Sequence, residues 1–285
     1  MAVAHGSRDP RASATVAALL DGVRLARPGI DVHAAYLDHS RPSLGEALAG
    51  IDGAVVLPLL LTEAYHSRVD IPAALREAVA TRPGLRVHQG ATLGPHPLLI
   101  TALERRLAEA GVEIGDPDTA VVLVSAGSSD ARANAVIARM AREWARSGGW
   151  HSVTPAYASA CSPTPEDAVR ELLAGRPGPT TNHRTDPANP HRTEPSSPLQ
   201  TERFFPPRTE PSSPRRAASR VVVASYLLAP GHFADKVRTN TLRAGAHAVA
   251  APLGQAPELP AILLERYAQA LPRTFQPRIP IPATI

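Results

Sequence analysis

Three side chains that could bind a metal ion or carry a proton stand where three apolar stretches of the sequence end. His5 ends the first stretch, Asp38 directly follows the second, and His66 comes a few residues after the third. Two imidazoles and a carboxylate suit a borderline divalent cation such as Co²⁺, Fe²⁺, Ni²⁺ or Zn²⁺. The carboxylate can also accept a proton. These residue types therefore predict a metal site with a base beside it.

A plainer interpretation fits the same residues. A histidine that follows a strand is more often a hydrogen-bonded turn residue than a metal ligand, and Asp38 could be a turn or cap residue. His39, next to it, could equally be a surface residue. Spacing alone therefore leaves the metal site and the ordinary turns evenly matched.

An alternation of predicted strands and helices would bring these side chains to one edge of a sheet. Strands are predicted at 2–5, 30–37, 53–61 and 85–90, with helices between them and another helix from Pro97 to about Ala110. Ligands of parallel α/β sheets gather at the carboxyl ends of the strands. We therefore expect the three candidates to meet at that edge.

Local signals mark where the helices begin. Ser7 or Asp9 is predicted to start the first helix, with Pro10 in its first turn. The stretch Ser43–Glu46 is typical of a capping box, and Asp70 is predicted to cap the helix that follows it.

The second part of the chain repeats this order. "TAVVLVSAGSSD" corresponds to "AVAHGSRD", and "VVVASYLLAPGH" corresponds to "VVLPLLLTEAYH". Self-similarity at such a long period predicts an α/β fold of two pseudo-symmetric parallel-sheet βα-repeat domains. We expect a first domain at 1–117, a second at 118–275 and a tail at 276–285. In the second copy Ala126 replaces His5 and Ser159 replaces Asp38, while His232 is retained at the position of His66, which predicts one active centre.

A proline-rich segment at 176–219 interrupts the second copy. It holds ten of the thirty prolines and repeats the phrase "RTEPSSP". Such a composition buries too little apolar surface to offset the entropy of ordering. We expect a disordered insertion, with a proline-rich ligand for a partner as the alternative.

Composition excludes several classes of function. The net charge of +4 comes mostly from segment 176–219, which has seven Arg against four acidic residues, so nucleic-acid binding is not expected. Lys236 is the only lysine and lacks a phosphate-loop context, and no G-x-G-x-x-G occurs, so no nucleotide is expected. We find no membrane-length apolar run or signal peptide, and Cys161 is the only cysteine. A cytoplasmic protein without membrane association is the expectation.

Three segments carry a resemblance to a known family. "VAHGSRDPRA", "LPLLLTEAYHSRVDIP" and "GPHPLL" resemble, in order, the signature segments of the sirohydrochlorin chelatases. The two-unit layout resembles the long, internally duplicated form of that family. The resemblance implies a chelatase-like fold and ATP-independent insertion of cobalt, iron or nickel into sirohydrochlorin or a close relative.

The resemblance also implies roles for individual residues. It makes His5 and His66 the metal ligands and gives Asp38, at a position where the family usually has Glu, a catalytic role. Loss of two pyrrole protons accompanies metal entry, and Asp38 or Glu63 could accept one. A polycarboxylate substrate would pair with arginines. The expected tetrapyrrole-cleft residues are Arg8, Arg41, Arg68, His96 and His232, although His96 could equally have a structural role at a helix start.

The sequence therefore predicts a lyase that inserts Co²⁺ or Fe²⁺, as a substrate, into sirohydrochlorin for sirohaem or cobalamin biosynthesis. A non-catalytic metal- or tetrapyrrole-binding delivery protein is the alternative, and a structural scaffold with a partner-recruiting arm is a third possibility. Because the duplication supplies two halves in one chain, a monomer is favoured.

Overall fold

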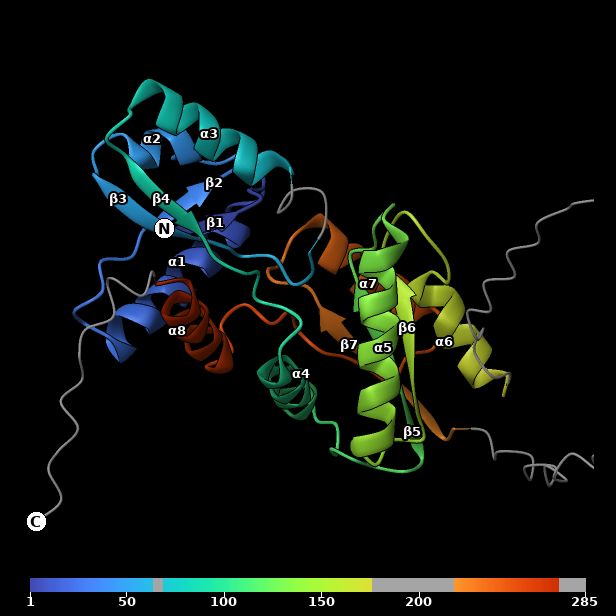
Figure 1. The fold of residues 1–285 in the computed structure, drawn as a ribbon. Helices are drawn as coiled ribbons and strands as arrows, with labels where there is room; N and C mark the ends of the chain where they lie inside the picture. Colours follow the sequence, from blue (N-terminus) through green and yellow to red (C-terminus); the bar gives the residue numbers. More distant parts are fainter. Residues whose placement is uncertain (64–68, 176–217, 272–285) are drawn as a thin grey trace, which may run out of the picture.

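Two parallel sheets organise the chain. The computed structural model describes residues 1–63, 69–175 and 218–271. One sheet has the order β2-β1-β3-β4 and the other the order β6-β5-β7-β8 (Figure 1). The two orders are the same when each half is numbered separately, which confirms the α/β class and the pseudo-symmetric duplication. The predicted insertion at 176–219 and the tail fall almost wholly outside the described residues.

The first sheet and its helices precede the second along the chain. The first comprises β1 (Ala2–Ala4), α1 (Pro10–Ala26), β2 (Ala34–Tyr36), α2 (Leu44–Leu48), β3 (Gly53–Pro58), α3 (Ile71–Thr81), β4 (Arg86–Gln89) and α4 (Pro97–Glu109). The second comprises β5 (Thr119–Ser125), α5 (Ala131–Ser147), β6 (Ser152–Tyr157), α6 (Pro165–Leu173), β7 (Arg220–Tyr226), α7 (His232–Arg243), β8 (Ala248–Val249) and α8 (Glu258–Ala270). No described helix is long and apolar enough to cross a membrane.

Most of the predicted helix starts are confirmed. Asp9 caps α1 by accepting a hydrogen bond from the Arg11 backbone N–H, and Pro10 is the first helical residue. Ser43 and Glu46 form the predicted capping box of α2. The prediction for Asp70 is wrong, because its backbone is already helical and its side chain makes no capping hydrogen bond to α3.

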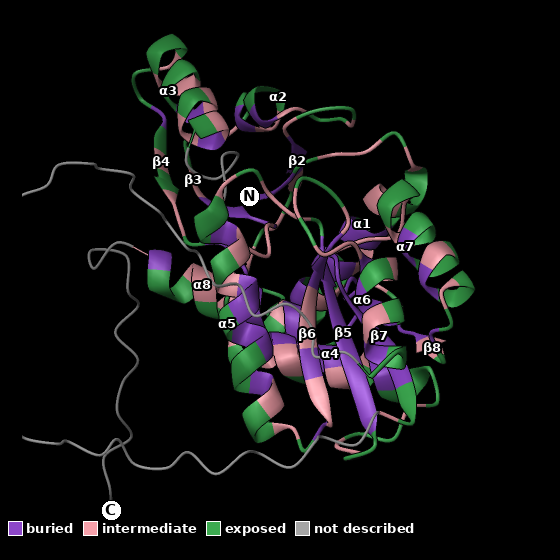
Figure 2. Ribbon diagram, turned by 90° about the vertical axis from the view of Figure 1, so that its right-hand side faces the viewer, coloured by how far each residue is buried: buried purple, intermediate pink, exposed green. Residues whose placement is uncertain are grey.

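The last helix of each half packs against the other half. α4 contacts β7, and α8 contacts α1 and β3 (Figure 1). One hydrophobic cluster consequently contains residues of both halves, among them Leu103 of α4, Val222 of β7 and Ile262 of α8. Figure 2 shows the central strands β5 and β7 of the second sheet largely buried, the neighbouring β6 partly so, and α5 buried along one side. Burial of this shared apolar surface fixes the two sheets relative to each other.

A buried tyrosine adds a polar link between the halves. Tyr226 ends β7 with only 2% of its surface exposed, and its hydroxyl donates to the Leu61 carbonyl at 2.8 Å. Burial raises the pKa of Tyr226, so the hydroxyl stays protonated and can donate. Leu61 belongs to the segment that follows β3.

Replacing Tyr226 with phenylalanine is expected to lower the free energy of unfolding by about 1–3 kcal/mol, because the Leu61 carbonyl loses its buried donor. Urea denaturation followed by circular dichroism measures the change. The control is Tyr267→Phe, which removes the hydroxyl of a half-buried tyrosine on α8. Equal stability of Tyr226→Phe and the wild type would contradict this role of the hydroxyl.

Candidate functional site

A large cleft lies between the two halves, at the carboxyl ends of the central strands. Its volume is about 1030 Å³, just above the range of about 300–1,000 Å³ typical of small-molecule sites. Residues that follow β1, β3, β5 and β7 line it, together with the first turns of α1 and α7. The position agrees with the expectation that ligands bind where parallel strands end.

The loop after β1 brings His5 to this cleft. The His5 carbonyl accepts a hydrogen bond from the Asp38 backbone N–H at 2.9 Å, and the His5 side chain is exposed and lines the cleft. Gly6 has φ +95°, and a Cβ atom at Gly6 would lie 1.7 Å from the Asp38 carbonyl oxygen. The loop therefore requires glycine at this position.

The second half retains the backbone of this loop without its histidine. Ser159 N–H donates to the Ala126 carbonyl at 2.9 Å, as Asp38 N–H does to His5. Gly127 has φ +83°, and its Cβ atom would lie 2.0 Å from the Ser159 carbonyl oxygen. The duplicated loop thus preserves the fold of the strand end, while Ala126 provides no metal-binding side chain.

The structure separates Asp38 from the cleft and brings its neighbour into it. Asp38 Oδ1 accepts from the His39 backbone N–H at 2.7 Å, and Asp38 Oδ2 lies 3.3 Å from His39 Nε2. Asp38 does not line the cleft, whereas His39 does. The backbone φ of His39 is +58°, which is uncommon for a non-glycine residue. In the sequence, only its position directly after Asp38, at the end of a strand, points to His39 as a site residue.

The other predicted site residues divide into two groups. Arg8 and His232 line the cleft. Arg41 does not, because its guanidinium pairs with Glu46 of α2. His66 and Arg68 lie outside the described residues.

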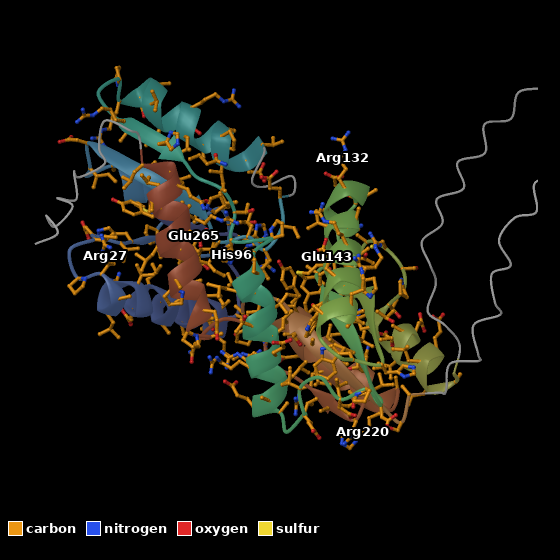
Figure 3. All side chains as sticks on the ribbon, turned by 60° about the horizontal axis from the view of Figure 1, so that its bottom comes forward. Arg27, His96, Arg132, Glu143, Arg220 and Glu265 are labelled. Carbon is orange, nitrogen blue, oxygen red and sulfur yellow. The ribbon has the colours of Figure 1, made fainter. Side chains whose placement is uncertain are left out.

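His96 has a structural position away from the cleft lining. Its Nδ1 atom accepts from the Leu98 backbone N–H at 3.2 Å and caps α4. Its Nε2 atom lies 3.0 Å from Glu265 Oε2 on α8 (Figure 3). The contact joins α4 and α8, the last helices of the two halves. It agrees with the alternative in which His96 has a structural role at a helix start.

The charge of the cleft suits an anionic ligand. Among the described residues, its lining has one arginine, Arg8, and the imidazoles of His5, His39 and His232, with no Asp, Glu or Lys.

No group of three or more His, Cys, Asp or Glu is arranged to hold a metal within the part of the chain that the structure describes.

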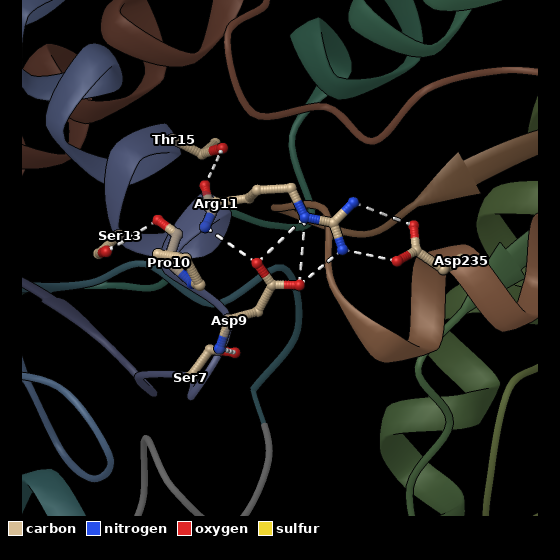
Figure 4. Close-up of polar contacts among 7 residues, drawn as sticks. All are labelled: Ser7, Asp9, Pro10, Arg11, Ser13, Thr15 and Asp235. Carbon is tan, nitrogen blue, oxygen red and sulfur yellow. Dashed lines mark hydrogen bonds and ion pairs between the residues drawn. The ribbon is translucent and has the colours of Figure 1, made fainter.

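An ion pair joins the two halves beside the cleft. Arg11 of α1 contacts Asp235 of α7 with Nη2 at 2.6 Å from Oδ2, and it also contacts Asp9 (Figure 4). Hydrogen bonds from Arg11 hold the pKa of both carboxyls below their usual range, so the contact forms at neutral pH. The side chains are about half-exposed, so the pair positions α7 more than it stabilises the fold.

Two parallel α/β halves facing each other across a cleft at their strand ends define a protein of the chelatase-like fold. The chain belongs to the CbiX family, whose model matches residues 1–110 and 120–178. The resemblance of the signature segments is therefore confirmed.

Individual relatives agree with this assignment. The chain is 28% identical over 183 residues to a sirohydrochlorin cobaltochelatase of Priestia megaterium, covering 60% of this chain and 58% of the relative. It is 27% identical over 176 residues to a sirohydrochlorin ferrochelatase of Bacillus subtilis, covering 60% and 66%. Each match thus spans less than two thirds of the relative's length.

Solved structures support the fold. SirB from Bacillus subtilis with Fe³⁺ superposes with a TM-score of 0.69 at 20% identity, covering 94% of this chain and 93% of SirB. A structure of CbiX, described as the terminal enzyme of sirohaem biosynthesis in denitrifying bacteria, has a TM-score of 0.60 at 19% identity, covering 95% of this chain and 99% of that chain. At these identities the likeness shows the shared fold alone.

Proposed function

We propose that this protein is a sirohydrochlorin chelatase that inserts Co²⁺ or Fe²⁺ into the tetrapyrrole without a nucleotide, for sirohaem or cobalamin biosynthesis. The observation that carries the proposal is an exposed imidazole, His5, on a cleft of about 1030 Å³ whose described lining has no carboxylate. The size suits a tetrapyrrole and the charge suits its acid groups. Family membership and the names of the curated relatives support the same activity.

In this proposal the metal ion is a substrate held briefly by few ligands. His5 and His66 bind it through neutral imidazoles and pass it to the pyrrole nitrogens, because a closed site with more ligands would not release it. Arg8 pairs with a carboxylate of the tetrapyrrole. Residues 1–117 supply these groups, while residues 118–275 provide the facing wall.

Metal insertion releases two pyrrole protons, so the site needs an acceptor. Asp38 and Glu63 were the expected acceptors, and both are exposed side chains outside the lining of the cleft. His39 lines the cleft, and the carboxylate of Asp38 lies beside its Nε2 atom. We assign His39 as the group that faces the substrate, with Asp38 orienting its ring.

Replacing His39 with glutamine is expected to lower kcat for metal insertion by about 100-fold, because a general base is lost. Steady-state assays with sirohydrochlorin and Co²⁺ measure the effect. His33→Gln is the matched control, since His33 pairs with Asp31 at 2.7 Å but does not line the cleft. If the two variants keep the same kcat as the wild type, His39 has no role as an acceptor.

The activity itself is tested by mixing purified protein with sirohydrochlorin and Co²⁺ or Fe²⁺ and following the absorbance change of the macrocycle. The proposal predicts a rate above that of the protein-free reaction, without ATP. Binding of metal and tetrapyrrole with no gain in rate would instead support the delivery-protein alternative.

A further inference from the structure

The first turn of α7 carries a large apolar side chain on the second half's side of the cleft. Phe233 is 49% exposed and lines the cleft. Other large apolar side chains with exposure of 40% or more in the described part of the chain do not line it: Leu25, Val69, Ile114, Leu173 and Leu242. Ligand clefts are lined mainly by apolar and aromatic side chains, so the place of Phe233 on a ligand-sized cleft points to contact with a ligand.

The surroundings of Phe233 suit a flat, largely apolar ligand face. Leu228, Ala229 and Pro230 line the same wall directly before α7. The His232 ring lies edge-on to the Phe233 ring, with centroids 6.0 Å apart and an interplanar angle of 67°. Phe233 therefore extends an apolar wall of the same cleft whose lining carries Arg8 and the imidazoles.

The position of this turn is fixed relative to the loop that carries His5. Asp235, two residues after Phe233, is held by Arg11 at 2.6 Å. Arg11 lies in the first turn of α1, and Asp9, which Arg11 also contacts, caps that helix just after the His5 loop. Figure 4 shows Arg11 in contact with both Asp9, at the start of α1, and Asp235, in the first turn of α7. These contacts fix the turn that carries Phe233 relative to the helix start that follows the His5 loop.

We propose that Phe233 is the stacking surface for the tetrapyrrole macrocycle. Its ring lies against one face of the macrocycle and holds the pyrrole nitrogens within reach of the metal delivered by His5. Aromatic rings prefer such offset contacts with other conjugated rings. The inference rests on the proposed function, and it makes the second half the substrate-positioning wall rather than a relic of duplication.

The test measures binding of metal-free sirohydrochlorin by absorbance titration, alongside steady-state insertion of Co²⁺. Phe233→Ala is expected to raise Kd and KM about 10-fold, consistent with the loss of one aromatic contact and its buried area. Phe233→Leu, which keeps an apolar side chain but no flat ring, should also bind more weakly than the wild type, whereas Phe233→Tyr should bind normally. Binding of Co²⁺ alone should be unchanged in all three variants.

Leu242→Ala provides the matched control, because Leu242 is a 41% exposed apolar residue on the same helix and does not line the cleft. Equal sirohydrochlorin affinity for Phe233→Ala and wild type would overturn the inference and leave the proposed function standing. Equal affinity for Phe233→Leu and wild type would overturn stacking in favour of simple apolar contact. A wild-type protein that binds no sirohydrochlorin would overturn both proposals.

Discussion

Replacing His5 with alanine is expected to lower the rate of metal insertion by about 100-fold or more, since even groups that only orient metal ligands contribute 10–100-fold. In the proposal, His5 brings one of two imidazoles to the ion, and the remaining histidine alone would hold it weakly. The assay is insertion of Co²⁺ into sirohydrochlorin at saturating tetrapyrrole. A parallel titration with Co²⁺ alone should show weaker metal binding.

The control for this variant is His88→Ala, because His88 is an exposed histidine on β4 that does not line the cleft. It should retain the rate and the Co²⁺ affinity of the wild type. Unchanged insertion by the His5→Ala variant would remove His5 from the metal site, even if the protein proves to be a chelatase.

Substituting Gly6 with alanine is expected to abolish most activity and to destabilise the fold. The new Cβ atom would lie 1.7 Å from the Asp38 carbonyl oxygen, so the loop that carries His5 must move. A non-glycine residue at a φ of +95° adds strain of about 1–3 kcal/mol. Thermal denaturation and the insertion assay measure the two effects separately.

Gly127→Ala is the matched variant from the second half. Its Cβ atom would meet the Ser159 carbonyl oxygen at 2.0 Å, so we expect a similar loss of stability. The loop of Gly127 carries Ala126 in place of a histidine. Per folded molecule, the Gly127→Ala variant should therefore keep far more activity than the Gly6→Ala variant. Equal losses of activity per folded molecule would contradict the assignment of the metal site to the first half.

Features set by neighbouring residues were predictable from the sequence. Asp9 and Pro10 begin α1 as expected, and Ser43 and Glu46 form the capping box, because these signals act within one helical turn. The duplication was also visible, since both halves keep the same order of strands, helices and glycine loops. Asp70 is the exception, because the helical backbone extends past the residue expected to cap it.

Features that depend on contacts between distant residues were not predictable. His96 of α4 pairs with Glu265 of α8. Each of these helices is the last of its half and packs against the other half, and no local sequence pattern predicts that packing. Two adjacent residues also differ in position, because the loop adopts a positive φ at His39. His39 lines the cleft, whereas Asp38 lies outside its lining and contacts the His39 ring. Phe233 was missed because exposure of an apolar residue is decided by the packing of whole helices.

The proposed chelatase mechanism depends on the imidazoles of His5 and His66 together holding one exchangeable metal ion. X-ray absorption spectroscopy of the Co²⁺-loaded protein, compared with the His5→Ala and His66→Ala variants, tests it most directly. If both imidazoles bind the ion, scattering from two imidazoles is expected in the wild type and from one in each variant. A Co²⁺ shell of oxygen ligands alone, or one that neither substitution alters, would contradict it.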